Sequence, residues 1–138
     1  MAREIEVVLE GIAVNAVLRE DAAPKTVAAL LRALPITSTA VHCICSGECI
    51  WFKSDQVPIA FPETETVYLS QGDIALGYDN DFLIAYGRRC STRGFKGYLP
   101  YNPIAVVRDL DAMERFAKVA HSIEFEGGKA ISVRQRSA

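Results

Sequence analysis

The sequence predicts a mainly β fold, a barrel or a sandwich, in which two helices cover the open ends. Three features of the 138-residue chain lead to this prediction. Most apolar segments are short and alternate with polar residues at a period of two, which is typical of strands that bury one face. Turns that contain glycine or asparagine separate these segments. Only two segments carry apolar residues at helical spacing.

The chain opens with a hairpin and a helix. Residues 4–10 and 12–18 are rich in Val, Ile and Leu and are joined by a Glu-Gly turn, so they are expected to pair as strands. Asp21 then provides a capping carboxylate, and Pro24 suits a first helical turn because its missing N–H is not needed there. Pro35 ends the helix. The apolar stripe of this helix consists of Val27, Leu30, Leu31 and Leu34.

A second hairpin is expected where residues 39–45 and 49–52 flank a three-residue loop that contains Gly47. A loop of this length places Cys43 opposite Trp51. Alternation along the strands then divides the side chains between two faces. One face carries Cys43, Cys45, Cys49 and Trp51, and the other carries His42, Ile44, Ile50 and Phe52.

Strands and two long loops are expected to fill the next part of the chain. Two prolines indicate a surface loop over residues 53–65, and a composition rich in Arg, Ser, Gly and Pro indicates a second over 87–101. The expected strands lie at residues 66–69, 73–78, 82–86 and 103–108.

A second helix and a closing hairpin end the chain. Asp109 or Asp111 can cap the helix. Its apolar side consists of Met113, Phe116, Ala117 and Ala120. A Gly-Gly pair between residues 122–125 and 129–133 predicts the hairpin.

Charge and composition argue against several classes of protein. Fifteen basic and seventeen acidic residues leave a formal net charge of −2, which gives no global field to attract nucleic acid. No apolar run reaches the length of about 18 residues that a membrane span takes. Acidic residues near the N-terminus interrupt the apolar stretch of a secretory signal. We therefore expect one cytoplasmic domain over residues 1–138 that binds neither nucleic acid nor a membrane.

Two stretches resemble cyclophilins. Residues 23–27, Ala-Pro-Lys-Thr-Val, are similar to the start of the first cyclophilin helix, which follows an N-terminal hairpin. Residues 106–113, with Phe116 and a final strand after them, are similar to the late strand and second helix of that family. The order and spacing of elements agree across nearly the whole chain. The resemblance implies a cyclophilin-like antiparallel β-barrel of about eight strands with two capping α-helices.

The catalytic arginine of cyclophilins does not carry over. Val41-His42-Cys43 stands where the family has Phe-His-Arg, so a cysteine replaces the arginine. Prolyl isomerisation is slow because amide resonance sets a barrier of about 18–20 kcal/mol, which a guanidinium helps to lower. A thiol is neutral or negative and cannot take over this role.

Other positions of the isomerase pocket differ as well. Trp51 takes the place of the active-site glutamine. Residues 81–84 resemble the family's Gln-Phe-Phe-Ile, with Asp81 for glutamine and Leu83 for phenylalanine. The pocket histidine falls near Tyr101 or Asn102. The chain therefore resembles a small bacterial cyclophilin-like family of unknown function.

The residues and the resemblance together predict a protein that binds a small molecule or short peptide in a surface groove, without efficient prolyl isomerase activity. An anionic ligand is favoured, and no cofactor is expected. The alternative is a peptidyl-prolyl cis-trans isomerase with a non-standard active site, so whether the protein is an enzyme stays open. The candidate ligand-binding residues are Cys43, Trp51, Asp81, Leu83, Arg88, Arg89, Tyr98, Tyr101 and Asn102.

Basic residues of the second long loop favour the anionic ligand. Arg88 and Arg89 form its expected cationic rim, and Arg93 and Lys96 lie further along the same loop. Cations interleaved with aromatic side chains can bind phosphate or carboxylate. The alternative is a solvated loop whose cations pair locally.

The cysteines and His42 allow two further interpretations. Thiolates and imidazole suit zinc, but His42 lies on the opposite strand face and a fourth ligand is missing, so we expect no metal there. Cys43 is a candidate nucleophile only if a base or cation such as Arg88 activates it. Otherwise the cysteines act as small half-buried apolar residues.

A homo-oligomer is a third possibility. Ile59, Ala60 and Phe61 lie between two prolines and offer an apolar loop for self-association.

Overall fold

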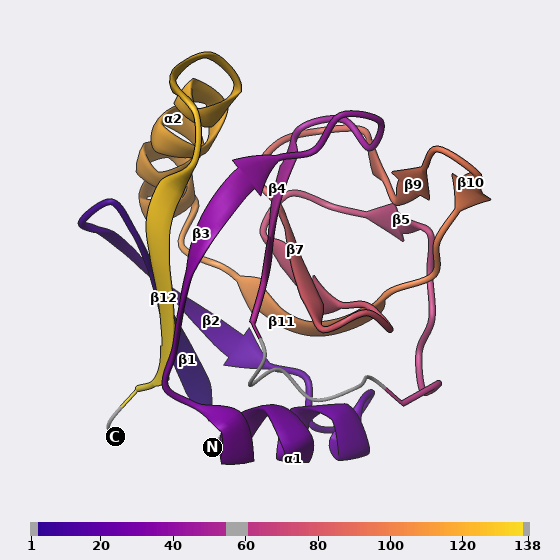
Figure 1. The fold of residues 1–138 in the computed structure, drawn as a ribbon. Helices are drawn as coiled ribbons and strands as arrows, with labels where there is room; N and C mark the ends of the chain where they lie inside the picture. The colour runs from indigo at the N-terminus through magenta and orange to yellow at the C-terminus, as the bar shows by residue number, and fades with distance from the viewer. Residues whose placement is uncertain (1–2, 55–60, 137–138) are drawn as a thin grey trace.

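Eight strands close into an antiparallel barrel in the computed structural model, which describes residues 3–54 and 61–136 (Figure 1). The order around the barrel is β1-β12-β3-β4-β7-β6-β11-β2, so each strand has two hydrogen-bonded neighbours. These strands are β1 (Glu4–Leu9), β2 (Ile12–Leu18), β3 (Ile36–His42), β4 (Cys49–Lys53), β6 (Asp73–Leu76), β7 (Asp81–Ala85), β11 (Asn102–Val107) and β12 (Lys129–Gln135). The predicted mainly β barrel with two helices is confirmed.

The interior of the barrel holds the larger hydrophobic core. Along β1 the buried residues Ile5, Val7 and Leu9 alternate with half-buried ones, as a strand with one inward face requires. Phe52 and Phe82 come from neighbouring strands and stack with their ring centroids 4.7 Å apart. Burying an apolar side chain of this size contributes roughly 1.5–3 kcal/mol, so the interior is the main source of stability.

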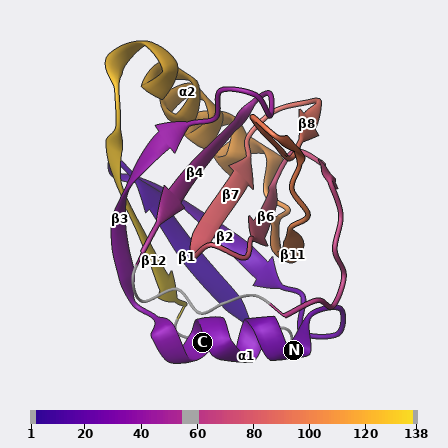
Figure 2. The same ribbon diagram turned by 45° about the vertical axis from the view of Figure 1, so that its right-hand side comes forward.

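The two helices lie at different ends of the barrel. Helix α1 (Pro24–Ala33) crosses one end, and Figures 1 and 2 both show it beneath the strands. Helix α2 (Leu110–Glu126) packs beside β1, β2 and β3 towards the other end. Among the described residues, no helix combines the length and the apolar character that crossing a bilayer takes.

The N-terminus of α1 is capped from a distant loop. Asp21 is not the cap, because the N-cap position falls on Ala23, which makes no side-chain hydrogen bond. The carboxylate of Glu63 instead accepts the backbone N–H groups of Lys25 at 3.0 Å and Thr26 at 2.8 Å. Burial raises the pKa of Glu63, but these hydrogen bonds favour the charged form and leave the pKa below its usual value. The cap predicted at Asp21 is therefore wrong.

Helix α2 begins as predicted but ends later. The Asp109 side chain caps it by accepting the Ala112 N–H at 3.1 Å. The strand predicted over residues 122–125 is wrong, because the helix continues to Glu126 and buries Ile123 on the same side as its earlier apolar residues. Gly127 ends the helix with φ 91° and donates its N–H to the Ile123 carbonyl. The glycine pair therefore ends a helix rather than turning a hairpin.

The connection between β3 and β4 is longer than predicted. Val41 pairs with Trp51, and the Cys43 N–H donates to the Cys49 carbonyl at 3.0 Å, so Cys43 faces Cys49 rather than Trp51. The shift is by an even number of residues, so Cys43, Cys49 and Trp51 keep one predicted face and His42, Ile50 and Phe52 keep the other. Ile44 and Cys45 lie in the connection, and Ile44 is exposed, so the strand face predicted for these two residues is wrong. The loop opens because it packs against the chain after β7: a Cβ on Gly47 would lie 2.5 Å from the Arg89 carbonyl oxygen.

Short strands replace much of the second predicted loop, and the strand predicted at residues 66–69 lies outside the barrel. The segment expected as the loop 87–101 contains β8 (Cys90–Ser91), β9 (Arg93–Gly94) and β10 (Gly97–Tyr98). Strand β8 pairs with β5 (Tyr68–Leu69) outside the barrel, so the strand expected at 66–69 forms no hairpin with β6. Residues 55–60 of the loop expected over 53–65 lie outside the described residues.

Candidate functional site

A pocket of about 250 Å³ lies on the outer face of the barrel, over β4 and β7. Pairing of these strands sets Trp51 opposite Leu83 and Lys53 opposite Asp81. All four side chains line the pocket, together with Cys43 at the end of β3. The remaining walls come from the β3–β4 connection and from the segment before β11, and they include Ile44, Cys45, Ser46, Arg93, Phe95, Leu99 and Tyr101.

A second, smaller hydrophobic cluster supports the floor of the pocket. It lies on the outer side of β4, β6 and β7, where the folded segment before β11 covers these strands. This cover explains why β6 and β7 are buried on both faces. The cluster consists of Cys49, Leu69, Ala75, Leu83, Ala85, Cys90 and Tyr101, with Cys43 packed against it.

The structure brings together several of the residues predicted from the sequence. Cys43, Trp51, Asp81, Leu83 and Tyr101 all line the outer pocket, although residues 43 and 101 are far apart in the chain. Their convergence follows from strand pairing and from the return of the chain into β11.

The other predicted residues lie elsewhere. Arg88 borders a different hollow, beside α2. Arg89 has a positive φ of 60° and contacts the β3–β4 connection through its backbone carbonyl. Tyr98 is exposed, outside the pocket lining. Asn102 is fully buried, and its side-chain oxygen Oδ1 accepts the backbone N–H groups of residues 63 and 64, which is a structural role.

Asp81 and Tyr101 form a buried polar pair at the pocket. The Tyr101 hydroxyl donates to Asp81 Oδ2, and the Asp79 N–H donates to Oδ1 at 3.3 Å. Burial raises the pKa of Tyr101, and the carboxylate acceptor raises it further, so the phenol stays a neutral donor. A Cβ at Gly77 would lie 2.6 Å from Asp81 Oδ1, so the pair requires glycine at that position.

Two cations border the pocket, and they differ in their partners. Lys53 Nζ lies 2.6 Å from Asp79 Oδ2 and 6.0 Å from the Trp51 ring centroid. Arg93 is held through its backbone, since its N–H donates to Ser46 Oγ at 3.0 Å. Its guanidinium lies 5.4 Å from the Tyr98 ring centroid, and no carboxylate within residues 3–54 and 61–136 pairs with it.

Arg93 and Lys53 are therefore pocket residues outside the set of ligand-binding candidates chosen from the sequence. Arg93 was one basic residue among several in a loop expected to be irregular. Only the packing of that loop over β4 and β7 brings Arg93 to the pocket and takes Arg88 away from it. Lys53 shares the alternation of Trp51 along β4, which was the available signal.

The four cysteines are free thiols. Hydrogen bonding with Cys43 and burial raise the pKa of Cys49, and hydrogen bonding with Cys49 and burial raise that of Cys90. Both thiols are buried and stay protonated, as expected of apolar packing residues. His42 lies on the other strand face and reaches away from the thiols, as its place in β3 predicted.

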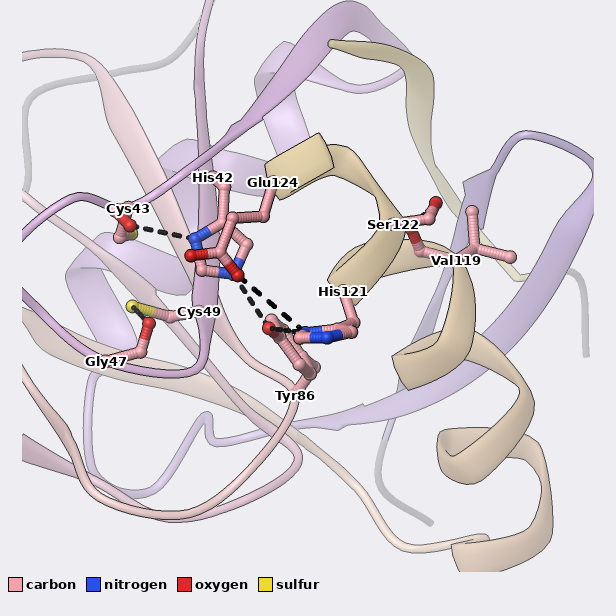
Figure 3. Close-up of polar contacts among 9 residues, drawn as sticks. All are labelled: His42, Cys43, Gly47, Cys49, Tyr86, Val119, His121, Ser122 and Glu124. Carbon is pink, nitrogen blue, oxygen red and sulfur yellow. Dashed lines mark hydrogen bonds and ion pairs between the residues drawn. The ribbon is translucent and has the colours of Figure 1, made fainter. Parts of the chain in front are cut away.

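A second polar cluster lies between β3, the end of β7 and helix α2 (Figure 3). His42 Nε2 is 2.7 Å from the Tyr86 hydroxyl, which is also 3.2 Å from His121 Nδ1. Glu124 Oε2 lies 3.9 Å from the same His121 nitrogen. The sequence did not indicate this cluster, because a strand was expected over residues 122–125 and a strand hides the helical spacing of His121 and Glu124.

The fold and the pocket define a class: a closed eight-stranded antiparallel barrel with two helices and a ligand-sized pocket on its outer face. The chain belongs to the family described as "Protein of unknown function (DUF3830)", whose sequence model matches residues 5–134. No protein with a curated description matches the chain.

Two solved structures share the fold. The structure of McbB in complex with tryptophan superposes with a TM-score of 0.77 at 23% identity, over 97% of this chain and 45% of McbB. This chain thus spans less than half the length of McbB. The solution structure of the hypothetical protein AF2241 from Archaeoglobus fulgidus gives a TM-score of 0.65 at 21% identity, over 98% of this chain and 95% of AF2241. At these identities the likeness concerns the fold alone.

Proposed function

We propose that this protein is a single cyclophilin-like domain that binds a small anionic molecule with an apolar body in the outer pocket. The observation that carries the proposal is an aromatic and apolar pocket bordered by Arg93, a cation without a carboxylate partner among the described residues. Ligand pockets commonly combine apolar walls with a few polar groups that set orientation. We also expect the protein to be cytoplasmic and of bacterial origin.

The apolar walls suit a flat or compact ligand body. Trp51 and Leu83 are cross-strand partners in β4 and β7, and the exposed ring of Phe95 also lines the pocket. Aromatic side chains favour stacked or edge-on contact with a planar ligand. The neighbouring fold of McbB is seen with tryptophan, a small molecule of this kind, which supports the choice of an aromatic body.

Arg93 supports a negative charge on the ligand. A guanidinium forms paired hydrogen bonds with a carboxylate or a phosphate. Lys53 already contacts Asp79 and is the weaker candidate. We therefore assign the cationic rim to Arg93, in place of the rim first expected at Arg88 and Arg89.

The proposal is tested with Trp51, the only tryptophan of the chain, as a reporter. Phenylacetate added to the protein is expected to change Trp51 fluorescence saturably, and neutral phenylacetamide is expected to bind at least about tenfold more weakly, because one charge-assisted hydrogen bond is worth about 1.5–3 kcal/mol. Arg93→Ala is expected to abolish the difference between the two probes.

Arg88→Ala is the matched control, since it removes a cation from the same segment but outside the pocket. It should leave both affinities unchanged. If neither probe changes Trp51 emission saturably, or if Arg93→Ala binds phenylacetate as the wild type does, an anion-binding pocket is the wrong assignment. Tryptophan itself is measured by calorimetry as a third probe.

The isomerase alternative has one observation in its favour. Arg93 comes from the segment after Gly87 and lines the pocket beside Cys43, the position where cyclophilins carry arginine. The pocket nevertheless carries Trp51 and Leu83 at the positions where cyclophilins have the glutamine and phenylalanine that shape the proline slot. We expect no acceleration of cis-trans exchange in an X-Pro peptide followed by NMR. If the wild type accelerates the exchange and Arg93→Ala does not, isomerase activity is the correct assignment and the proposed ligand binding is wrong.

Self-association rests on a segment that is only partly described. Ile59 and Ala60 lie outside the described residues, and Phe61 is 42% exposed. Homo-oligomerisation through this loop remains an expectation, and sedimentation velocity measures it directly.

A further inference from the structure

We propose that His42, His121 and Glu124 form a binding site for a divalent transition metal, with zinc as the probe. This site is separate from the outer pocket and independent of the proposed ligand. Among the described residues, one ligand atom from each of these side chains lies within 4.8 Å of the others. Two imidazoles and one carboxylate make a ligand set that zinc uses, with a fourth position left for water.

The hydrogen bonds of His42 prepare it to bind a metal. Its Nδ1 lies 2.8 Å from the Cys43 carbonyl oxygen, which can only accept, so Nδ1 carries the proton. In the neutral ring, Nε2 then presents its lone pair towards His121 and Tyr86. Metal-binding histidines commonly donate their other N–H to a backbone carbonyl or carboxylate in this way, which fixes the tautomer and the ring orientation.

Helix α2 supplies the other two ligands from one face. His121 and Glu124 are three residues apart, so their side chains are neighbours on the helix surface. Figure 3 shows both side chains directed towards His42 across the gap between the helix and β3. Their side chains are about half exposed, at 54% and 51%, and so are free to adjust.

The distances are close to those of a four-coordinate zinc site. Metal–ligand bonds of about 2.0–2.2 Å in a tetrahedron put neighbouring ligand atoms about 3.4 Å apart. The pair His121 Nδ1 and Glu124 Oε2 is at 3.9 Å, and the widest separation in the group is under 4.8 Å. A metal-binding geometry therefore requires side-chain rotations of His121 and Glu124, which are about half exposed.

The Tyr86 hydroxyl occupies the centre of the cluster, so it has to move aside for a metal ion to bind there. The hydroxyl lies between the two ring nitrogens, at 2.7 and 3.2 Å, so both nitrogens already point to one place. For metal binding His121 must leave Nδ1 unprotonated and keep its proton on Nε2. Surface hollows reach the site from two sides, one bordered by His42 and Glu124 and the other by Tyr86 and His121.

Zinc titration of the chelator-treated protein by calorimetry tests the site. We expect one zinc per chain, and we expect His121→Ala and Glu124→Gln each to weaken binding by at least tenfold, because even outer-shell changes cost 10–100-fold in metal affinity. Both side chains are exposed, so neither variant is expected to unfold the protein. Glu114→Gln, an exposed carboxylate earlier on the same helix, is the matched control and should bind as the wild type does.

Cobalt distinguishes this site from the cysteines. The Co²⁺-loaded protein should show the visible bands of a four- or five-coordinate nitrogen and oxygen site, without a thiolate charge-transfer band. A thiolate band, the absence of stoichiometric zinc binding, or unchanged affinity in both His121→Ala and Glu124→Gln would overturn the proposal. Failure of phenylacetate binding would leave it intact, because the two sites share none of these ligands.

Discussion

The carboxyl group of Asp81 lies at the outer pocket, where it accepts the Tyr101 hydroxyl in a space that only glycine at position 77 leaves open. Leaving a buried polar group without a hydrogen-bond partner destabilises the folded state by roughly 1–3 kcal/mol. Burial of Asp81 and Tyr101 therefore requires that they bond to each other. The sequence identified both residues as site candidates. It did not indicate that they bond to each other, because that contact depends on the return of the chain before β11.

At the scale of single residues we predict a clear order of cysteine reactivity. Cys45 is exposed, whereas Cys49 and Cys90 are buried thiols whose pKa values are raised. Since the thiolate is the reactive form, iodoacetamide at neutral pH should modify Cys45 at least about tenfold faster than Cys49 or Cys90. Mass spectrometry of peptides from a labelling time course measures the rates.

The unfolded protein in guanidinium chloride is the control, and there all four cysteines should react at similar rates. Modification of Cys90 as fast as Cys45 in the native protein would mean that the segment before β11 does not cover the outer cluster as described.

At the scale of elements, the start of α1 shows how tertiary structure replaces a local cap. Glu63 is far from the helix in sequence but receives two of its free N–H groups. The helix itself was predictable, because Pro24, the apolar spacing and Pro35 are all local signals. The identity of the cap was not, because it depends on where a distant loop lies.

We predict that Glu63→Ala destabilises the protein by about 1 kcal/mol, the usual value of a helix cap. Urea unfolding at pH 7 measures the change. Asp21→Ala, which removes the locally expected cap, is the matched control and should cost much less. An equal or larger effect of Asp21→Ala would contradict the role of Glu63.

The stabilisation that Glu63 provides is expected to depend on pH. Hydrogen bonds hold the pKa of Glu63 below its unfolded value, so its contribution is present above about pH 4.3 and is lost as the pH falls through the lower folded pKa. The stability difference between wild type and Glu63→Ala should therefore shrink in strongly acidic solution.

At the scale of the whole molecule, burial of thiols and phenols links stability to alkaline pH. Cys49, Cys90 and Tyr101 have raised pKa values in the folded state. The folded protein keeps protons that the unfolded chain releases, so their contribution is complete below about pH 8.5 and declines as the pH rises above that value. We predict a lower urea midpoint at pH 10 than at pH 7.

Cys90→Ala tests the origin of this effect, because it removes one of the groups that keep a proton. Its midpoint should fall less steeply between pH 8 and pH 10 than that of the wild type. If the two profiles run parallel, the alkaline loss of stability comes from other groups.

Local patterns were enough to predict a mainly β fold, most strands and the two helices, and the resemblance to cyclophilins implied the barrel. Period-two alternation along β1, β2 and β4 and helical spacing in α1 and α2 depend only on which side chains avoid water. The outer-face position of Cys43, Trp51, Asp81 and Leu83 follows from the same alternation. The predicted β3–β4 register is wrong, but the outer-face position of Cys43 and Trp51 is still correct, because the error is an even number of residues.

Tertiary structure decided what local patterns leave open. Whether Gly127 turns a hairpin or ends a helix, and whether Arg88 or Arg93 reaches the outer pocket, depends on contacts between segments distant in the chain. The cluster of His42, His121 and Glu124 is another product of such contacts. The sequence by itself determined the faces of the strands, because hydrophobic burial acts residue by residue. Only folding in three dimensions determined which side chains meet, because it joins parts of the chain that no local pattern connects.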